Sequence, residues 1–95
     1  MRIVWTEPAP RDLAAARAWV AAHDKRAADR QVERVLTAVA GLLRFPEIGR
    51  PGRRTGTREL IISQTPYIAA YRVDVELIEI LRVLHSRRRW PDTLT

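Results

Sequence analysis

The chain has 95 residues and a mass of 10.9 kDa, which is enough for one small hydrophobic core, so we expect a single domain over residues 1–95. It has no cysteine, which excludes a disulfide framework and a thiolate metal site. No apolar run approaches the roughly 18 to 20 residues of a membrane span, and the N-terminus lacks a signal-peptide core. These features predict a cytoplasmic protein without a membrane partner.

Positive charge is unevenly distributed along the chain. Seventeen basic residues stand against eleven acidic ones, a net charge of +6, and every basic residue except Lys25 is arginine. Residues 44–58 carry five arginines and one acid, and residues 82–95 carry four arginines and one acid. The planar guanidinium group matches phosphate and carboxylate. If folding brings these two stretches together, they form one basic face for a polyanionic or acidic partner.

The first half of the chain predicts a strand followed by two helices. Residues 2–6 are rich in β-branched and aromatic residues and precede two prolines, which favours a strand. Residues 11–23 are rich in alanine with apolar positions at helical spacing, and residues 25–44 repeat apolar positions every three or four residues. Asp24 is a suitable N-cap for the second helix. Because almost nothing links the two helices, we expect an antiparallel hairpin.

The second half predicts a loop and a three-stranded meander. Residues 45–56 contain five prolines and glycines, which predicts a surface loop without regular structure. Residues 58–63, 67–73 and 77–85 have the pattern of strands joined by hairpins. With the first strand beside them, the order β-α-α-β-β-β predicts an α+β domain. In it, the antiparallel helix hairpin packs on one face of a small, mainly antiparallel sheet of about four strands.

The end of the last predicted strand holds the residues that could support chemistry. Strict alternation places Arg82 on one face with Ile78, Ile80 and Leu84, and turns the intervening residues, among them Leu81 and Val83, the other way. An arginine among apolar neighbours either pairs with a carboxylate such as Glu59 or binds phosphate or carboxylate at the rim of a groove.

His85, at the end of the same strand, is either a general acid or base or a hydrogen-bonded structural residue. The only other histidine is His23, and neither histidine has a metal-ligand spacing. The sequence also lacks a nucleotide-binding or cofactor motif. We therefore expect no metal and no cofactor.

Residues 86–95 form a basic C-terminal tail. Three consecutive arginines would by default be solvated, but the adjacent Trp90 offers a stacking surface for a base or an anchor for a partner protein. We take this tail and the arginines of the loop and middle strand as candidate sites for a partner or a nucleic acid. These residues are Arg50, Arg53, Arg54, Arg58, Arg72, Arg87, Arg89 and Trp90.

Four segments carry a family resemblance: Phe45-Pro46-Glu47-Ile48-Gly49-Arg50, Gly56-Thr57-Arg58-Glu59-Leu60, Tyr67-Ile68-Ala69-Ala70-Tyr71-Arg72-Val73 and Glu79-Ile80-Leu81-Arg82-Val83-Leu84-His85. Together they resemble the RelE/ParE toxin superfamily of bacterial type II toxin-antitoxin systems, from the first strand to Trp90. The resemblance implies the β-α-α-β-β-β fold and a toxin that inhibits growth. It also implies a cognate antitoxin protein that neutralises the toxin in a hetero-oligomer.

The superfamily resemblance implies one of two activities. RelE-type members cleave mRNA in the ribosomal A site with basic residues on the middle strands, whereas ParE-type members poison DNA gyrase. The RelE-type basic positions fall here at Glu59, Ile61 and Ile68, which cannot hold a phosphate, and only Arg88 coincides with a basic catalytic position. The resemblance therefore favours ParE-like inhibition of DNA gyrase.

Two alternatives remain open at the level of sequence. The first is a RelE-like, ribosome-dependent mRNA endonuclease without a metal, in which Arg82 and Arg88 would bind the phosphate and His85 would transfer the proton. The second is a non-toxic, basic nucleic-acid-binding module, because basic charge alone gives salt-sensitive binding to any nucleic acid.

Overall fold

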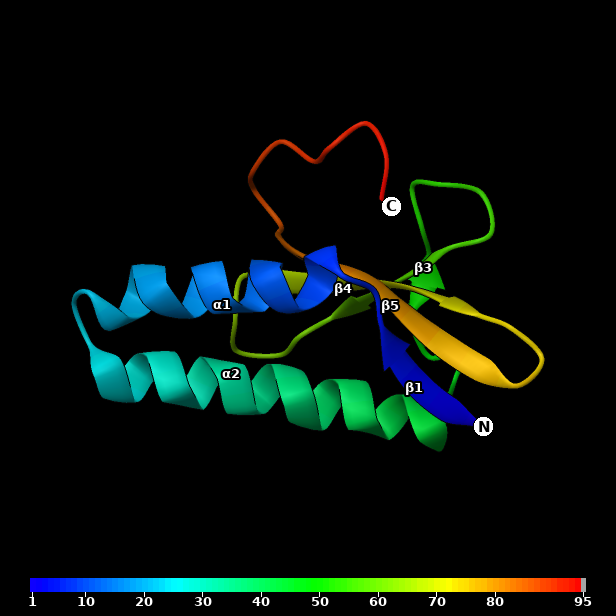
Figure 1. Ribbon diagram of the computed structural model, residues 1–95, viewed down its shortest axis with the longest axis horizontal. Coiled ribbons are helices and arrows are strands. Elements are labelled where there is room, and N and C mark those ends of the chain that lie inside the picture. Colours follow the sequence, from blue (N-terminus) through cyan, green and yellow to red (C-terminus); the bar gives the residue numbers. More distant parts are fainter. Residues whose placement is uncertain (95) are drawn as a thin grey trace.

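The computed structural model describes residues 1–94, and residue 95, which the expected domain and tail include, lies outside the described residues. Figure 1 shows two helices lying side by side against a sheet. The elements in chain order are β1 (Arg2–Trp5), α1 (Pro8–Ala21), α2 (Lys25–Ala40), the 3-10 helix η1 (Gly41–Leu43), β2 (Arg50–Pro51), β3 (Arg58–Ile61), β4 (Tyr67–Val73) and β5 (Leu77–His85). The predicted α+β class is confirmed.

The sheet has five strands in the order β1-β5-β4-β3-β2, with β1 parallel to β5 and the other neighbours antiparallel. About four strands were expected, and the addition is the two-residue β2. There, Arg50 pairs with Glu59 and Pro51 with Arg58, so the prediction of a loop without regular structure was wrong at these two positions. Pro51 is tolerated because β2 is an edge strand, where an N–H donor is not required.

The starting points of the two helices have local causes. Helix α1 starts at Pro8, earlier than predicted, because the first N–H groups of a helix have no partner in the helix and proline costs little there. The predicted cap of α2 is confirmed: the Asp24 side chain accepts a hydrogen bond from the Ala27 N–H at 3.0 Å. Neither helix, nor any other within residues 1–94, is long and apolar enough to cross a bilayer.

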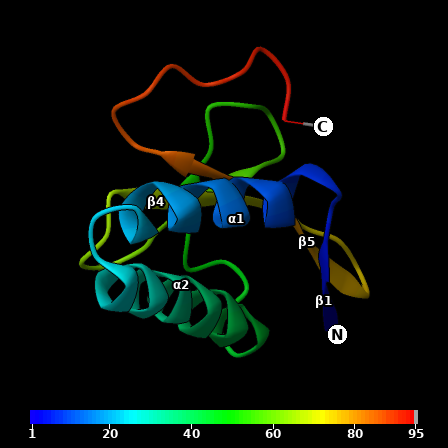
Figure 2. The same ribbon diagram turned by 60° about the vertical axis from the view of Figure 1, so that its left-hand side comes forward.

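The main core lies between the helices and the sheet, and a smaller cluster lies on the opposite face. The main core contains Ala9, Val35, Val39, Leu42, Ile62, Tyr67, Ala69, Tyr71, Ile78, Ile80 and Val83. The smaller cluster contains Ala70, Leu81 and Leu94, with Leu84 and Trp90 packed against it. Figure 2 shows α2 on one side of the sheet and the C-terminal segment on the other. The tail therefore covers the face that the helices leave open.

A β-bulge separates these two clusters along β5. Ala70 pairs with Arg82, but the next residue, Tyr71, pairs with Ile80, so Leu81 is an extra residue in β5. The expectation of strict alternation was wrong beyond Ile80, because a bulge shifts the direction of the side chains that follow it. As a result Val83 packs in the main core with Ile80, while Leu81 joins the smaller cluster.

Tyr71 attaches the loop after η1 to the sheet. Its side chain is fully buried, and its hydroxyl donates to the Pro46 carbonyl and accepts from the Gly49 N–H, both at 2.8 Å. A Cβ atom at position 49 would lie 2.6 Å from Cε1 of Tyr71. This close approach requires glycine at position 49.

Candidate functional site

Arg82 of β5 forms an ion pair with α1. Its Nε and Nη2 atoms donate to the Asp12 carboxylate at 2.6 and 2.8 Å, and the Val83 N–H donates to the same carboxylate at 3.0 Å. Of the two alternatives for Arg82, pairing with a carboxylate is therefore confirmed. The carboxylate is not Glu59, the example given, because α1 packs along β5 and supplies Asp12, whereas Glu59 lies on β3. Hydrogen bonding to Asp12 raises the pKa of Arg82, so the guanidinium stays charged and held in place.

Glu59 instead binds the loop that carries Arg50, Arg53 and Arg54, which we call the basic loop. This carboxylate is only 3% exposed, and its Oε1 accepts from Nε and Nη2 of Arg50 at 3.1 and 2.9 Å. Its Oε2 accepts from the backbone N–H of Arg53 at 2.9 Å. A buried carboxylate is stable when it is paired and hydrogen-bonded in this way. Glu59 therefore fixes the course of the chain from β2 into the following loop.

The C-terminal tail contacts this loop. The guanidinium carbon of Arg53 lies 3.7 Å from the centroid of the Trp90 ring, and Nη2 of Arg54 donates to the Pro91 carbonyl at 3.1 Å. Leu94 is only 6% exposed. Both views show the loop and the tail close together (Figures 1 and 2). The fold thus brings the two basic stretches of the sequence together, and the tail is docked rather than freely solvated.

A cleft of about 370 Å³ opens between α1, the end of β5 and the tail. Trp19, which is 66% exposed, contributes its ring from α1, and the guanidinium carbon of Arg88 lies 5.5 Å from its centroid. The residues that line the cleft are Asp12, Ala15, Ala16, Trp19, Tyr67, Val83, Leu84, His85, Arg88, Arg89 and Trp90. The cleft therefore combines aromatic surfaces with cations, and such a site can bind an anionic or planar group.

His85 enters this cleft beside Tyr67. The two rings meet edge to face, with their centroids 5.8 Å apart and an interplanar angle of 87°. Nδ1 of His85 accepts a hydrogen bond from the backbone N–H of Arg87 at 3.1 Å, which leaves Nε2 to meet a ligand. Burial raises the pKa of Tyr67, and Arg88 opposes part of that rise. Tyr67 is therefore a neutral hydroxyl at neutral pH.

The other candidate arginines divide into engaged and available side chains. Nη1 of Arg58 donates to the carbonyls of Glu47 and Gly49 at 3.1 and 2.9 Å. Arg72 forms an ion pair with Glu79 at 2.9 Å. In contrast, no ion pair within residues 1–94 involves the side chain of Arg87 or Arg89. Of the candidate cations, those of the tail are the most available to a partner.

Sequence reasoning did not find Trp19, Asp12 or Tyr67 as residues of the site. Trp19 and Asp12 lie on α1, more than sixty residues from the tail, and Tyr67 begins β4. The only sequence signal for Trp19 was a large aromatic among alanines on a predicted helix. No group of three potential metal ligands occurs within the described part of the chain.

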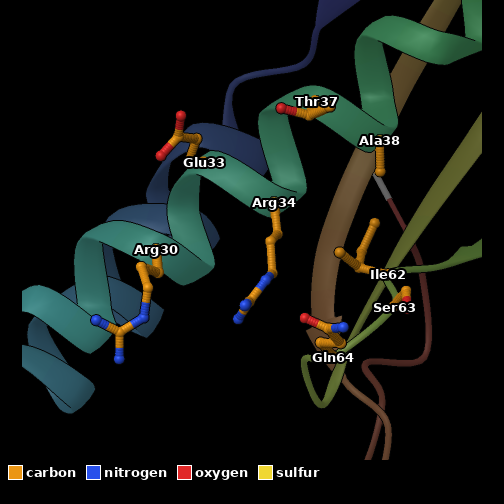
Figure 3. Close-up of a pocket in the computed structure, with 8 residues that line it drawn as sticks. All are labelled: Arg30, Glu33, Arg34, Thr37, Ala38, Ile62, Ser63 and Gln64. Atoms are coloured by element: carbon orange, nitrogen blue, oxygen red, sulfur yellow. The ribbon is translucent and has the colours of Figure 1, made fainter.

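A second groove, of about 530 Å³, lies between α2 and the connection from β3 to β4. Figure 3 shows Arg30, Glu33 and Arg34 projecting from α2, and Ala38 near Ile62. Beside this groove, β2 pairs with β3 only at Arg58 and Glu59. Among the described strands, none pairs with that edge of β3 beyond Glu59. The groove therefore combines charged side chains with an open sheet edge.

Comparison with solved structures places this architecture in a class. The structure described as a chromosomal ParDE toxin-antitoxin system from P. aeruginosa matches with a TM-score of 0.80 and 30% identity, over 90% of this chain and 95% of the other. The toxin-antitoxin complex RelBE2 from Mycobacterium tuberculosis matches with a TM-score of 0.58 and 31% identity, over 88% and 95%. The fold is that of the RelE/ParE superfamily of toxins.

Sequence comparisons then identify the family. The family model for the ParE toxin of type II toxin-antitoxin systems, parDE, matches residues 3–90. The chain is 44% identical to Y4kP of Sinorhizobium fredii, over 98% of this chain and 96% of that protein. It is 37% identical to toxin RelE2 of Caulobacter vibrioides, over 92% and 97%. The chain belongs to the ParE toxin family, and the expected superfamily is confirmed.

Proposed function

We propose that this toxin inhibits DNA gyrase. Its C-terminal tail contacts the target, together with the cleft between α1, the end of β5 and the tail, which we call the basic cleft. The observation that carries the proposal is the state of the residues that a ribonuclease would use. Arg82 is held by Asp12, and Glu59, which occupies a RelE-type basic position, is a buried carboxylate. A metal-free ribonuclease needs free cations at the phosphate, and these positions supply none.

The two further RelE-type positions support the same conclusion. Ile68 is 4% exposed and lies within the sheet, and Ile61 is 57% exposed but apolar. Neither side chain can stabilise charge on a phosphate. The tail arginines and Trp90 are better suited to contact with a partner surface, because arginine and tryptophan are enriched among residues that dominate protein interfaces.

A gyrase supercoiling assay, run beside a ribosome-dependent mRNA cleavage assay, tests the proposal. We expect the purified protein to inhibit supercoiling, and replacement of Arg87, Arg88 and Arg89 by alanine to reduce inhibition on the order of tenfold or more. His85→Ala has a smaller effect, because the proposal requires no proton transfer. Arg72→Ala is the matched control, since Arg72 already pairs with Glu79.

The RelE-like alternative is favoured by one observation: His85 and Arg88 line the same cleft. It predicts that mRNA is cut on ribosomes and that His85→Ala and Arg88→Ala each reduce cleavage on the order of a hundredfold or more. Ribosome-dependent cleavage by the wild-type protein that disappears in Arg88→Ala, with supercoiling unaffected, would contradict the gyrase proposal.

The groove beside α2 supports a place for the antitoxin. An extended segment can add a strand to the open edge of β3, and a helix can lie in a groove of this size. Arg30 and Arg34 favour acidic residues in that segment. Arg34→Glu should weaken antitoxin binding by about tenfold, whereas Arg11→Glu on α1, outside this groove, should leave it unchanged. Equal affinities of the two variants would place the antitoxin elsewhere.

A further inference from the structure

Trp19 is a large aromatic side chain that lies outside both hydrophobic clusters and is 66% exposed. It shares one face of α1 with Asp12, Ala15 and Ala16, because residues at i, i+3, i+4 and i+7 lie on the same side of a helix. All four line the basic cleft. The ion pair of Asp12 with Arg82 turns this face of α1 toward β5. The Trp19 ring is therefore held at the wall of the cleft and is open to a ligand.

Trp90, the other tryptophan of the cleft, is occupied by contacts within the protein. The guanidinium carbon of Arg53 lies 3.7 Å from the centroid of its ring, and its indole N–H donates to the His85 carbonyl at 3.3 Å. Trp90 also packs against the smaller hydrophobic cluster. It therefore forms a fixed wall, and a planar ligand in the cleft has the ring of Trp19 to stack on.

Two cations of the cleft are available to an anion. Arg88 and Arg89 are exposed, and no ion pair within residues 1–94 involves either side chain. The guanidinium carbon of Arg88 lies 5.5 Å from the centroid of the Trp19 ring, so an anion bound by Arg88 lies beside the aromatic surface. The carboxylate of Asp12, which also lines the cleft, is neutralised by Arg82. Little repulsion therefore opposes an anion here.

This combination matches the two parts of a nucleotide. The flat face of a base stacks on tryptophan, and a phosphate accepts hydrogen bonds from guanidinium groups. An acidic peptide would satisfy the arginines but leave the Trp19 ring in water, and an apolar anchor would leave the arginines unpaired. The volume of about 370 Å³ falls within the range of small-ligand sites, about 300 to 1,000 Å³. A nucleotide is the ligand class that uses both features.

We propose that the basic cleft binds an unpaired nucleotide of a DNA strand, with its base on Trp19 and its phosphates at Arg88 and Arg89. This inference rests on the proposed function in one respect, because the strand is taken to be the DNA on which gyrase acts. The toxin then contacts the DNA as well as the enzyme. Figure 2 shows the C-terminal segment on the side of α1 that faces away from α2, so a strand can enter the cleft without displacing the helix hairpin.

Fluorescence anisotropy with a labelled single-stranded oligodeoxyadenylate, without gyrase, tests the stacking contact. Trp19→Ala should raise the dissociation constant by about tenfold or more, and Trp19→Phe should retain most of the affinity because phenylalanine also stacks on bases. Phe45→Ala is the matched control, because Phe45 is a similarly exposed aromatic, at 60%, outside the cleft. A wild-type protein that does not bind, or equal effects of Trp19→Ala and Phe45→Ala, overturns the proposal.

A second pair of variants tests the phosphate contact. Arg89→Ala should weaken binding by about fivefold at about 0.1 M salt, as expected for the loss of one phosphate contact to a single strand. Arg2→Ala removes the same charge from an exposed position on β1 and should have less effect. Oligoadenylate RNA should bind no more tightly than the DNA, because the proposed contacts are to base and phosphate. Equal losses in the two variants, or tighter binding of the RNA, contradict the proposed DNA site.

A gyrase supercoiling assay separates this inference from the proposed function. If both hold, Trp19→Ala inhibits supercoiling less than Phe45→Ala does. A wild-type toxin that inhibits gyrase, with oligonucleotide binding unaffected by Trp19→Ala, overturns the nucleotide site and leaves the gyrase proposal in place. Binding that depends on Trp19 without any inhibition of supercoiling supports the nucleotide site and contradicts the proposed function.

Discussion

A single carboxylate, Asp12, holds α1 against the edge of β5 beyond β1. Strand β1 pairs with β5 only from Leu77 to Ile80. Farther along, the Val83 N–H donates to the Asp12 carboxylate, which also binds Arg82. Asp12 thus satisfies a backbone donor that an additional strand residue would otherwise satisfy.

Removal of Asp12 should therefore destabilise the fold. Asp12→Ala leaves both a backbone donor and a partly buried guanidinium without their partner, and we expect a loss of about 1 to 3 kcal/mol. The measurement is chemical denaturation followed by circular dichroism. Asp29→Ala is the control, because Asp29 forms a more exposed ion pair with Arg17 and should cost about 0.5 kcal/mol or less. Equal losses would mean that the Asp12 contacts contribute little.

Tyr71 should make the stability of the fold decrease at alkaline pH. Burial raises its pKa, and hydrogen bonding to Gly49 opposes part of that rise. Because the pKa is higher in the folded state, this contribution is fully present below about pH 10 and is lost as the pH rises through the folded-state value. We expect the free energy of unfolding to fall as the pH rises above about 10, as measured by urea titration.

Tyr71→Phe separates the role of the hydroxyl from that of the ring. It leaves the Gly49 N–H unpaired and should cost about 1 to 3 kcal/mol at pH 7. It should also reduce the alkaline loss. Tyr67→Phe is the control at pH 7, because no hydrogen bond to the Tyr67 hydroxyl occurs within residues 1–94. An unchanged alkaline profile in Tyr71→Phe would assign the pH dependence to other groups.

At the scale of elements, the C-terminal tail is a covering segment for the sheet. Leu94 packs with Ala70 and Leu81, and Arg53 stacks on Trp90. These contacts connect the tail to β4, β5 and the basic loop. The tail arginines can therefore contact a partner while the rest of the tail stays packed on the sheet and the basic loop.

Loss of the Leu94 contact should release the tail without unfolding the core. Leu94→Ala should lower stability by about 1 to 2 kcal/mol, less than a substitution in a central core, because the cluster is small. Trypsin cleavage after Arg87 to Arg89 should become faster, while circular dichroism stays unchanged. Leu43→Ala, at a side chain 49% exposed, is the control. Cleavage at the wild-type rate in Leu94→Ala would mean that Leu94 does not hold the tail.

At the scale of the whole molecule, local patterns predicted the elements but not the contacts between distant ones. Strands β4 and β5 have the bounds that alternation and hairpin spacing predicted, and Asp24 caps α2 as expected. The bulge at Leu81 and the short β2 depend on how neighbouring strands align, which no single segment encodes. The ion pair of Arg82 with Asp12 spans 70 residues. From the sequence, the residues that the end of β5 and the C-terminal tail contribute to the cleft could be named, but Asp12 and Trp19 on α1 could not.

The combined basic face predicts salt-dependent binding to any polyanion. We expect affinity for single-stranded DNA to fall as salt rises, and replacement of both Arg87 and Arg89 by alanine to reduce the slope of log affinity against log salt by about 1.4, because each phosphate contact contributes about 0.7. Fluorescence anisotropy measures this slope. Arg72→Ala, which removes a paired cation, should change it less. An affinity that does not change with salt concentration would exclude the basic face as the contact surface.

The contact of Gly49 with Tyr71 restricts the evolutionary paths open to this protein. Any mutation that gives residue 49 a side chain places its Cβ atom 2.6 Å from Cε1 of Tyr71 and 3.0 Å from the carbonyl oxygen of Glu59. It is therefore accessible only in a lineage where position 71 has already become smaller and the backbone at Glu59 can move by a few tenths of an ångström. A change at position 49 that comes before a change at position 71 produces this clash immediately. The two positions should therefore change as a coupled pair in descendants of this gene, with the change at position 71 coming first.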